Sequence, residues 1–186
     1  IFAMGVFLTA SAPTAVGVLS ADFPVESIQI PTANKSTVHG WLTYGKPGGG
    51  VVLLVHSMRS NRLEMLSRAR FLKDQGYSAL FIDLQAHGET AGEKITFGLR
   101  ESENVEASIA FLRQTFPAER IGAIGASLGA AAIVLAKQDL RLDAVILESL
   151  HATIEEAVDN RLKLHFGDYG SVLLSLMLSQ LSFHLD

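Results

Sequence analysis

The spacing of hydrophobic residues changes along the chain. Apolar and polar side chains alternate over residues 25–32 and 36–45, which predicts two half-exposed antiparallel strands. Residues 50–57 contain the unbroken aliphatic run VVLLV, which is typical of a strand buried on both faces. Two more strands are predicted at residues 77–85 and 120–127. A last one is predicted at 142–149.

Helical patterns separate the later strands. Residues 60–76 start with Ser60, a residue type that caps helices, and end at Gly76, a residue type that terminates them. Residues 101–116 carry one apolar stripe with helical spacing, made of Val105, Ile109, Leu112 and Phe116. The alanine-rich run that follows Ser127 predicts a third helix.

This order of elements predicts an α/β fold: an open, mostly parallel sheet with helices on both faces. The 186 residues suffice for one domain, which we place at residues 22–186. Residues 1–21 form an apolar segment without a charged side chain. That segment is either the remainder of a membrane anchor or signal peptide, with membrane association through residues 1–20, or a segment packed on the domain. Exported, anchored and cytoplasmic locations stay open.

Composition excludes several classes of function. The net charge is −4, from 15 basic and 19 acidic residues, and Lys and Arg do not cluster, so we expect no nucleic-acid partner. The chain has no cysteine, which excludes disulfides and thiolate metal sites. No motif for a cofactor or a metal is present, and none is predicted.

The candidate chemistry centres on Ser127. Residues 125–129 read G-A-S-L-G, a G-x-S-x-G motif between a predicted strand and a predicted helix. In this context the serine occupies a strained turn that exposes its hydroxyl, and Gly125 and Gly129 leave room for the close approach of backbone. Two alternatives are small residues kept for helix packing and a dinucleotide-binding loop, although G-x-G-x-x-G is absent.

Several stretches in the same order resemble the α/β hydrolases, over roughly residues 25–185. They are VVLLVHSMRSNR, GYSALFIDLQAHGET, ITFGLRES, RIGAIGASLGAAA and LDAVILESLHATIEEAVDNRL. The chain is most similar to bacterial members related to the prolyl-oligopeptidase and serine-aminopeptidase branches. The resemblance implies acyl transfer to water through a serine ester, with a small-molecule ester or a peptide as substrate. An acyltransferase and a catalytically silent binding module are the alternatives.

The resemblance also assigns roles to residues. Ser127 matches the nucleophile, and the backbone N–H groups of Leu128 and Met58 match the two halves of the oxyanion hole. Ser57 stands where the family usually has glycine, and Ala130 where a second glycine is common.

Other polar residues near the strand ends have structural interpretations. His56 precedes the nucleophile, so we expect it to hold its loop rather than act as base. Asp83 and His87 are expected to fix the loop after the following strand. Arg59 and Arg62 are expected to lie in a solvated helix start, unless they meet an acidic substrate group.

The acid and base of a triad have no clear position. In this fold the acid follows the serine and the histidine comes last. Glu148 is a minor candidate for the acid, and His151 is the best local candidate for a base. His165 falls on a predicted helix and His184 near the end of the sequence. We therefore expect the chain to be a fragment without the last two strands, which carry the triad Asp and His in the family.

Overall fold

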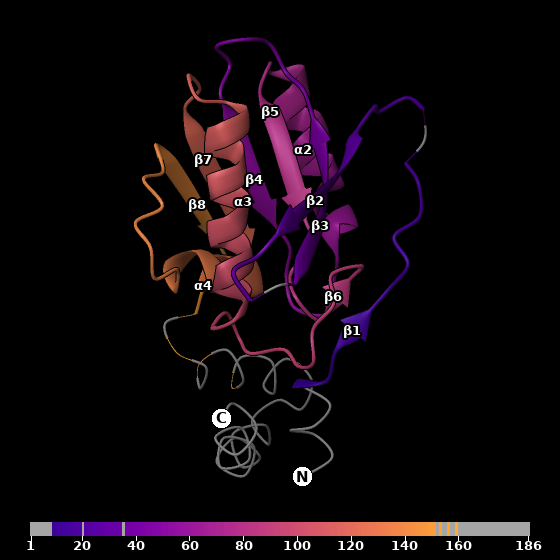
Figure 1. The fold of residues 1–186 in the computed structure, drawn as a ribbon, viewed down its shortest axis with the longest axis vertical. Coiled ribbons are helices and arrows are strands. Elements are labelled where there is room, and N and C mark those ends of the chain that lie inside the picture. Colours follow the sequence, from indigo (N-terminus) through magenta and orange to yellow (C-terminus); the bar gives the residue numbers. More distant parts are fainter. Residues whose placement is uncertain are drawn as a thin grey trace. The chain divides into compact units, whose positions relative to one another are not determined.

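The computed structural model describes residues 9–19, 21–34, 36–151, 153, 156 and 159. The chain divides into two compact units, one formed by Ser11–Leu150 and the other by Ile1–Ala10 together with His151–Asp186. The first unit holds the strands and helices drawn in colour in Figure 1. Its beginning at Ser11 differs from the sequence-based boundary at residue 22.

The main sheet of the first unit has six strands in the order β2-β3-β5-β4-β7-β8. The strands are β2 (Glu26–Pro31), β3 (Thr37–Thr43), β4 (Val51–Val55), β5 (Ser78–Ile82), β7 (Ile121–Ala126) and β8 (Ala144–Glu148). The β2–β3 and β3–β5 pairs are antiparallel, and the β5–β4, β4–β7 and β7–β8 pairs are parallel. The predicted antiparallel start followed by parallel strands is confirmed.

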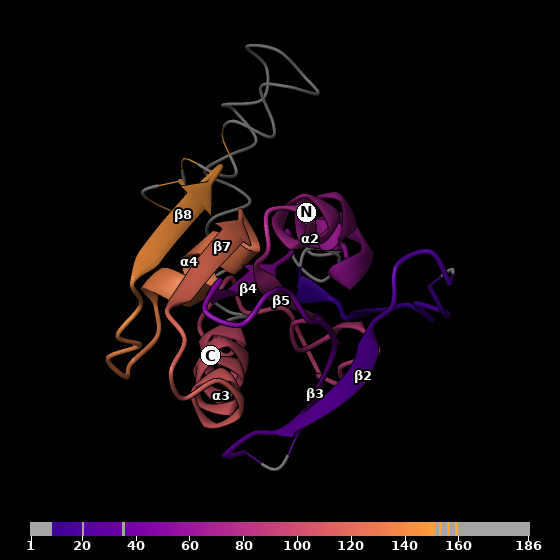
Figure 2. The same ribbon diagram turned by 90° about the horizontal axis from the view of Figure 1, so that it is seen from above.

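Helices cover both faces of this sheet, as predicted. They are the 3-10 helix η1 (Arg62–Met65) and the α-helices α2 (Leu66–Asp74), α3 (Glu101–Thr115) and α4 (Leu128–Val134). Seen from above, α2 and α3 lie on opposite sides of the central strands (Figure 2). The core on the side of α3 and α4 and the core on the side of α2 are separate hydrophobic clusters.

Strand β4 explains why the sequence shows an aliphatic run without alternation. Leu53 belongs to the cluster with Val105 of α3, whereas Leu54 belongs to the cluster with Met65 and Ala69 on the opposite face. Successive side chains of a strand point to opposite faces, so a central strand covered on both sides needs apolar residues at every position.

The helix boundaries correct two details. Asn61, not Ser60, caps the start of η1, because its side chain accepts a hydrogen bond from the Leu63 N–H at 3.0 Å. At the other end, Gln75 is the last capping residue of α2, and Gly76 follows it with a φ of 92°. A left-handed glycine just after the cap is a common way to end a helix.

Residues near the beginning of the first unit pack on the sheet domain. The short strand β1 (Ala12–Pro13) runs parallel to β6 (His87–Gly88). Val16 is buried in the cluster that contains Trp41. Within the described part of the chain, no helix has both the length and the apolar character needed to cross a membrane.

Two buried histidines join the loops after β4 and β5. His56 Nε2 accepts a hydrogen bond from the Leu84 N–H at 3.0 Å, so its proton lies on Nδ1, 2.6 Å from the Ser57 carbonyl oxygen. His87 Nε2 accepts from the Arg59 N–H at 3.0 Å, and its Nδ1 lies 2.9 Å from the Gln85 carbonyl. The rings contact each other edge to face, with centroids 5.1 Å apart. Each loop therefore supplies an acceptor to the other.

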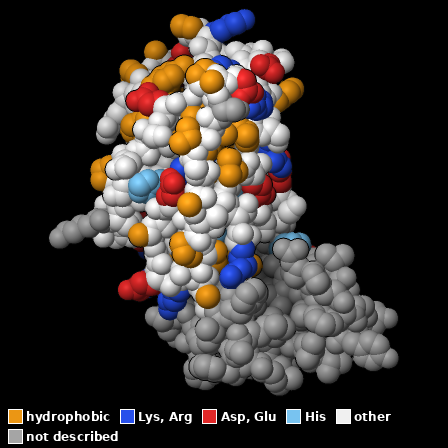
Figure 3. Space-filling model, turned by 90° about the vertical axis from the view of Figure 1, so that its right-hand side faces the viewer, with side chains coloured by type: hydrophobic (Ala, Val, Ile, Leu, Met, Phe, Trp, Pro, Cys, Tyr) orange, Lys and Arg blue, Asp and Glu red, His pale blue; other side chains and the backbone are white. Residues whose placement is uncertain are grey.

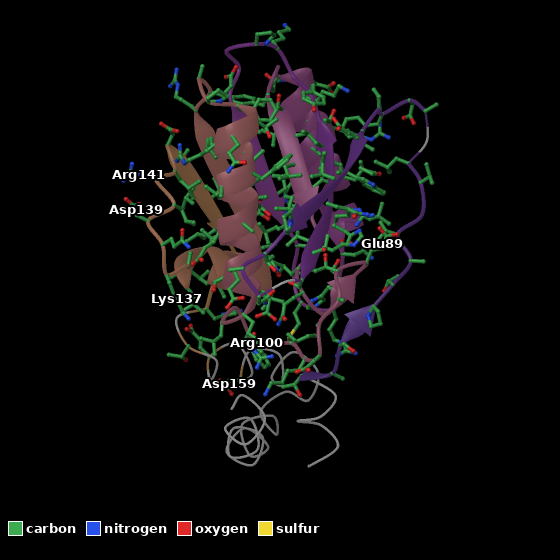
Figure 4. The ribbon with its side chains drawn as sticks, in the orientation of Figure 1. Glu89, Arg100, Lys137, Asp139, Arg141 and Asp159 are labelled. Carbon is green, nitrogen blue, oxygen red and sulfur yellow. The ribbon has the colours of Figure 1, made fainter. Side chains whose placement is uncertain are left out.

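The same loops share a buried ion pair. Asp83 accepts hydrogen bonds from the Arg62 backbone N–H at 2.7 Å and from the Arg62 guanidinium at 2.5 Å. The guanidinium also contacts Glu89, which Figure 4 labels, and lies over the Trp41 ring at 4.3 Å. Only 3% of Arg62 is exposed, so the prediction of a solvated helix start is wrong for this residue. Its partners lie more than 20 residues away in the sequence, in β3 and in the loops after β5 and β6, and only the fold brings them together.

The start of α4 touches the end of β4 without room for a side chain. A Cβ atom on Gly129 would lie 2.4 Å from the Val55 carbonyl oxygen and 2.9 Å from that of His56. A Cβ on Gly125 would lie 2.6 Å from the Ala130 nitrogen. These obstacles are backbone atoms, which cannot rotate away. The need for both glycines therefore follows from packing.

We predict that Gly125→Ala and Gly129→Ala each lower the free energy of unfolding by about 2 kcal/mol or more. A Cβ on Gly125 would overpack against the backbone of α4, and a Cβ on Gly129 would overpack against the end of β4. Gly122→Ala in the same strand is the matched control, since its Cβ would meet its nearest neighbour at 3.4 Å, an ordinary contact. Urea unfolding measures the free energy of unfolding of the three variants and of the parent. Equal losses in all three variants would contradict the prediction.

Stability should also depend on the protonation of His56. Burial lowers the pKa of His56 to about 4, from an ordinary 6.5. The folded state thus binds this proton more weakly than the unfolded state does. The neutral His56 therefore contributes roughly 3 kcal/mol to the free energy of unfolding above pH 6.5. This contribution is lost as the pH falls through 4. Urea unfolding between pH 7 and 4 measures it, and the loss should be smaller in His56→Gln. A parallel decline in both proteins would contradict the prediction.

Candidate functional site

Ser127 lies in the turn between β7 and α4, the strand–turn–helix context that the sequence predicts. Its backbone has φ 47° and ψ −105°, a conformation that residues with a side chain rarely adopt. The turn is held because the Ser127 N–H donates to the Glu148 carbonyl at 2.8 Å and the Ser127 carbonyl accepts from the Ala131 N–H at 3.0 Å. Such strain costs about 1–3 kcal/mol and persists only where the surroundings enforce it.

The hydroxyl of Ser127 is not engaged by any residue that the structure describes. The residue is half-buried, and within the described part of the chain its hydroxyl has no hydrogen-bond partner. Its neighbours contribute little bulk, since Gly125, Ala126, Gly129 and Ala130 surround it in the sequence.

The loop after β4 presents one unused backbone donor. The Ser57 N–H and hydroxyl both donate to Glu64 Oε2, at 2.9 and 2.8 Å. The Arg59 N–H donates to His87. Between them, the Met58 N–H has no acceptor among the described residues, and the same holds for the Leu128 N–H.

These two donors come from chain segments that are neighbours in space. Val55 of β4 and Gly125 of β7 are directly paired in the parallel ladder, so both strands end at the same edge. The backbone of Gly129 packs on the carbonyls of Val55 and His56, as described above. The loop that contains Met58 therefore leaves the sheet beside the turn that contains Ser127.

Glu64 is a functional candidate that the sequence did not reveal. Burial alone would raise the pKa of its carboxyl, but hydrogen bonds from Ser57 and Ser60 outweigh this and lower the pKa below its usual range. The charged carboxylate thus accepts both donors of Ser57 and holds this part of the loop. The sequence does offer one indication of such a partner. Position 57 is a serine, and its hydroxyl needs an acceptor once the loop packs.

Glu148, considered as a triad acid, is engaged in another way. Its carboxylate forms an ion pair with Arg68 of α2, with Arg68 Nε 3.1 Å from Oε1 and a second contact to Oε2. The pair raises the pKa of Arg68 through that hydrogen bond. Its backbone carbonyl meanwhile accepts the Ser127 N–H. Glu148 therefore supports the turn, with its carboxylate directed to a cation.

The histidines of the first unit do not provide a base. The acceptor nitrogen Nε2 of each of His56 and His87 is used on a backbone N–H group, and burial lowers the pKa of His87 as it does that of His56. His39 lies in β3, which β5 and β4 separate from β7. His151 belongs to the other unit, and His165 and His184 lie outside the described residues.

A second loop borders α4. Glu101 is fully buried and accepts four hydrogen bonds, from Gln85, the Thr96 backbone, the Thr96 hydroxyl and the Gly98 N–H, at 2.6 to 3.1 Å. A Cβ on Gly98 would lie 3.0 Å from Leu135 Cδ1. The carboxylate thus holds a loop that packs on the helix following Ser127. The sequence pattern does not predict this role, because Glu101 is there the first residue of an amphipathic helix.

Charges of both signs occur on the surface. On the face drawn in Figure 3, Lys and Arg side chains are interspersed with Asp and Glu side chains. Asp139 and Arg141 are exposed on the connection between α4 and β8 (Figure 4). Arg141 Nε lies 3.6 Å from Asp139 Oδ2. Among the described residues, no group of three or more His, Asp and Glu side chains is arranged to hold a metal ion.

Comparison with known proteins places the fold. No family model and no curated protein matches the chain. Among solved structures, an esterase from Pyrococcus furiosus superimposes with a TM-score of 0.74 at 23% identity, over 94% of this chain and 69% of the esterase.

Two further solved structures agree. A serine hydrolase without a lid from Xanthomonas campestris gives a TM-score of 0.56 at 16% identity, over 70% of this chain and 62% of that protein. An epoxide hydrolase from Vigna radiata gives a TM-score of 0.58 at 19% identity, over 81% of this chain and 47% of that protein. The chain thus spans less than two thirds of the length of these two proteins. The sheet order, the helices on both faces and these superpositions establish that the chain has the α/β-hydrolase fold.

Proposed function

We propose that the chain carries the nucleophile and the oxyanion-binding part of a serine hydrolase that cleaves an ester or amide through an acyl-serine at Ser127. One observation carries the proposal: a serine with a strained backbone and an unused hydroxyl stands at the carboxyl end of a central parallel strand. Ligands of open α/β sheets bind at that edge. The names of the neighbours, two of them an esterase and a serine hydrolase, agree with it.

In the proposed reaction, the Ser127 hydroxyl oxygen attacks the substrate carbonyl carbon and gives up its proton to a general base. The negative charge that develops on the carbonyl oxygen is bound by the Met58 and Leu128 N–H groups, which have no other acceptor among the described residues. The carbon–oxygen or carbon–nitrogen bond then breaks, and the leaving group takes the proton. In the second half of the reaction, water attacks the acyl-serine and releases the acyl group from Ser127.

The base lies outside the described residues of the first unit, since His56 and His87 are occupied. The prolyl-oligopeptidase-like resemblance and a peptide substrate remain part of the proposal. So does an alcohol as acceptor in place of water, which would make the protein an acyltransferase with the same nucleophile.

We predict that Ser127→Ala abolishes labelling by a fluorophosphonate probe and lowers ester hydrolysis about 10³-fold or more, because the nucleophile is lost. Ser149→Ala is the matched control, since Ser149 is an exposed serine with a φ of 52° just after the neighbouring strand β8. It should label and turn over like the parent. Undiminished labelling of Ser127→Ala would refute the assignment.

Glu148→Gln separates a triad acid from a supporting residue. We expect hydrolysis to stay within about three-fold of the parent, because the backbone carbonyl that holds Ser127 is retained. The lost ion pair is half-exposed, so the free energy of unfolding should fall by at most about 1 kcal/mol. Steady-state kinetics and urea unfolding measure both. A loss of activity of 10³-fold at unchanged stability would make Glu148 the acid.

A further inference from the structure

The Met58 N–H lies between two peptide groups that are fixed from different directions. On one side, the Ser57 N–H donates to the carboxylate of Glu64, a residue of η1. On the other side, the Arg59 N–H donates to Nε2 of His87, a residue of β6. Both acceptors are side chains, and each comes from an element other than the loop itself.

The backbone at Arg59 needs such support. Its φ is 59°, in the left-handed region that favours glycine. A non-glycine residue in this region stores strain, which must be offset by contacts elsewhere. The hydrogen bond to His87 is one such contact, and His87 is itself fully buried and fixed through Nδ1 to the Gln85 carbonyl.

Two fixed neighbours leave the peptide between them little freedom. The Met58 N–H belongs to the peptide plane that joins Ser57 to Met58. The plane before it, which joins His56 to Ser57, is held by Glu64, and the plane after it, which joins Met58 to Arg59, is held by His87. A donor to an oxyanion contributes most when it is aimed before the charge develops, and a displacement of about 1 Å can cost 10²-fold in rate.

We propose that Glu64 and His87 are positioning residues that together aim the Met58 N–H at the substrate oxyanion. This inference rests on the proposed function. Neither side chain needs to touch the substrate. Glu64 acts through Ser57, and His87 acts through Arg59.

The test removes each acceptor and then restores it. Glu64→Met and His87→Leu keep approximate size but accept no hydrogen bond, whereas Glu64→Gln and His87→Gln keep an acceptor oxygen within similar reach. For hydrolysis of 4-nitrophenyl acetate by the full chain, we expect kcat to fall roughly 10- to 100-fold in the first two variants. KM should change less than about three-fold, because the oxyanion forms only in the transition state. The Gln variants should recover most of kcat.

Glu119→Met is the matched control. Glu119 also accepts two loop N–H groups, from Gly48 and Gly50 at 2.6 and 2.8 Å, but before the start of β4 rather than after its end. The Glu119→Met variant should have a lower melting temperature than the parent and an unchanged kcat. A purely structural role for Glu64 and His87 predicts the same behaviour in their variants.

Amide hydrogen exchange, followed by NMR, tests the hydrogen bonds of this loop independently of catalytic activity. In the parent, the Ser57 and Arg59 amides should be protected and the Met58 amide should exchange faster. His87→Leu should remove protection at Arg59, and Glu64→Met at Ser57.

Unchanged kcat in Glu64→Met and His87→Leu, while Ser127→Ala is inactive, would overturn the positioning role and leave the proposed function standing. Full activity of Ser127→Ala would overturn the proposed function itself. Equal protection of the three amides in the parent would also overturn the positioning role.

Discussion

The contact between the start of α4 and the end of β4 determines the arrangement of the site. Gly129 packs on the Val55 carbonyl at a distance that excludes any side chain. This contact brings the turn at Ser127 beside the loop that follows β4. Because β4 and β7 are also paired in parallel, the hydroxyl and the unused Met58 N–H emerge at the same edge of the sheet. A larger residue at 129 would separate them even if both were otherwise unchanged.

Polar side chains complete this edge where the ladder of the sheet ends. Beyond the last ladder bonds, backbone N–H groups of the loops need other acceptors. Asp83, Glu64, Glu101 and the two imidazoles of His56 and His87 supply them. Most of these acceptors are buried, so a loop conformation that left one of them unpaired would be costly. The loops at this edge are thereby held by side-chain acceptors in place of a ladder.

Much of this could be predicted from the sequence, and the reason is local periodicity. The alternation in β2 and β3, the aliphatic run of β4 and the stripe of α3 each report the faces that a segment buries. Ser127 was found because its motif is five consecutive residues. The partners of Arg62, Glu148 and Ser57 were missed, since Asp83, Arg68 and Glu64 meet them only after folding. The cap at Asn61 was missed by one residue, because Ser60 has the same propensity.

The reciprocal bonds between the two histidine-bearing loops have a consequence for engineering and for evolutionary change. His56 sits in one loop and serves Leu84 in the other, while His87 sits in the second and serves Arg59 in the first. A graft that replaces only one of these loops with the loop of another protein of this fold would remove one imidazole acceptor. The backbone N–H that it served, on Leu84 or on Arg59, would then have no partner. The two loops therefore have to be exchanged together if both hydrogen bonds are to be kept.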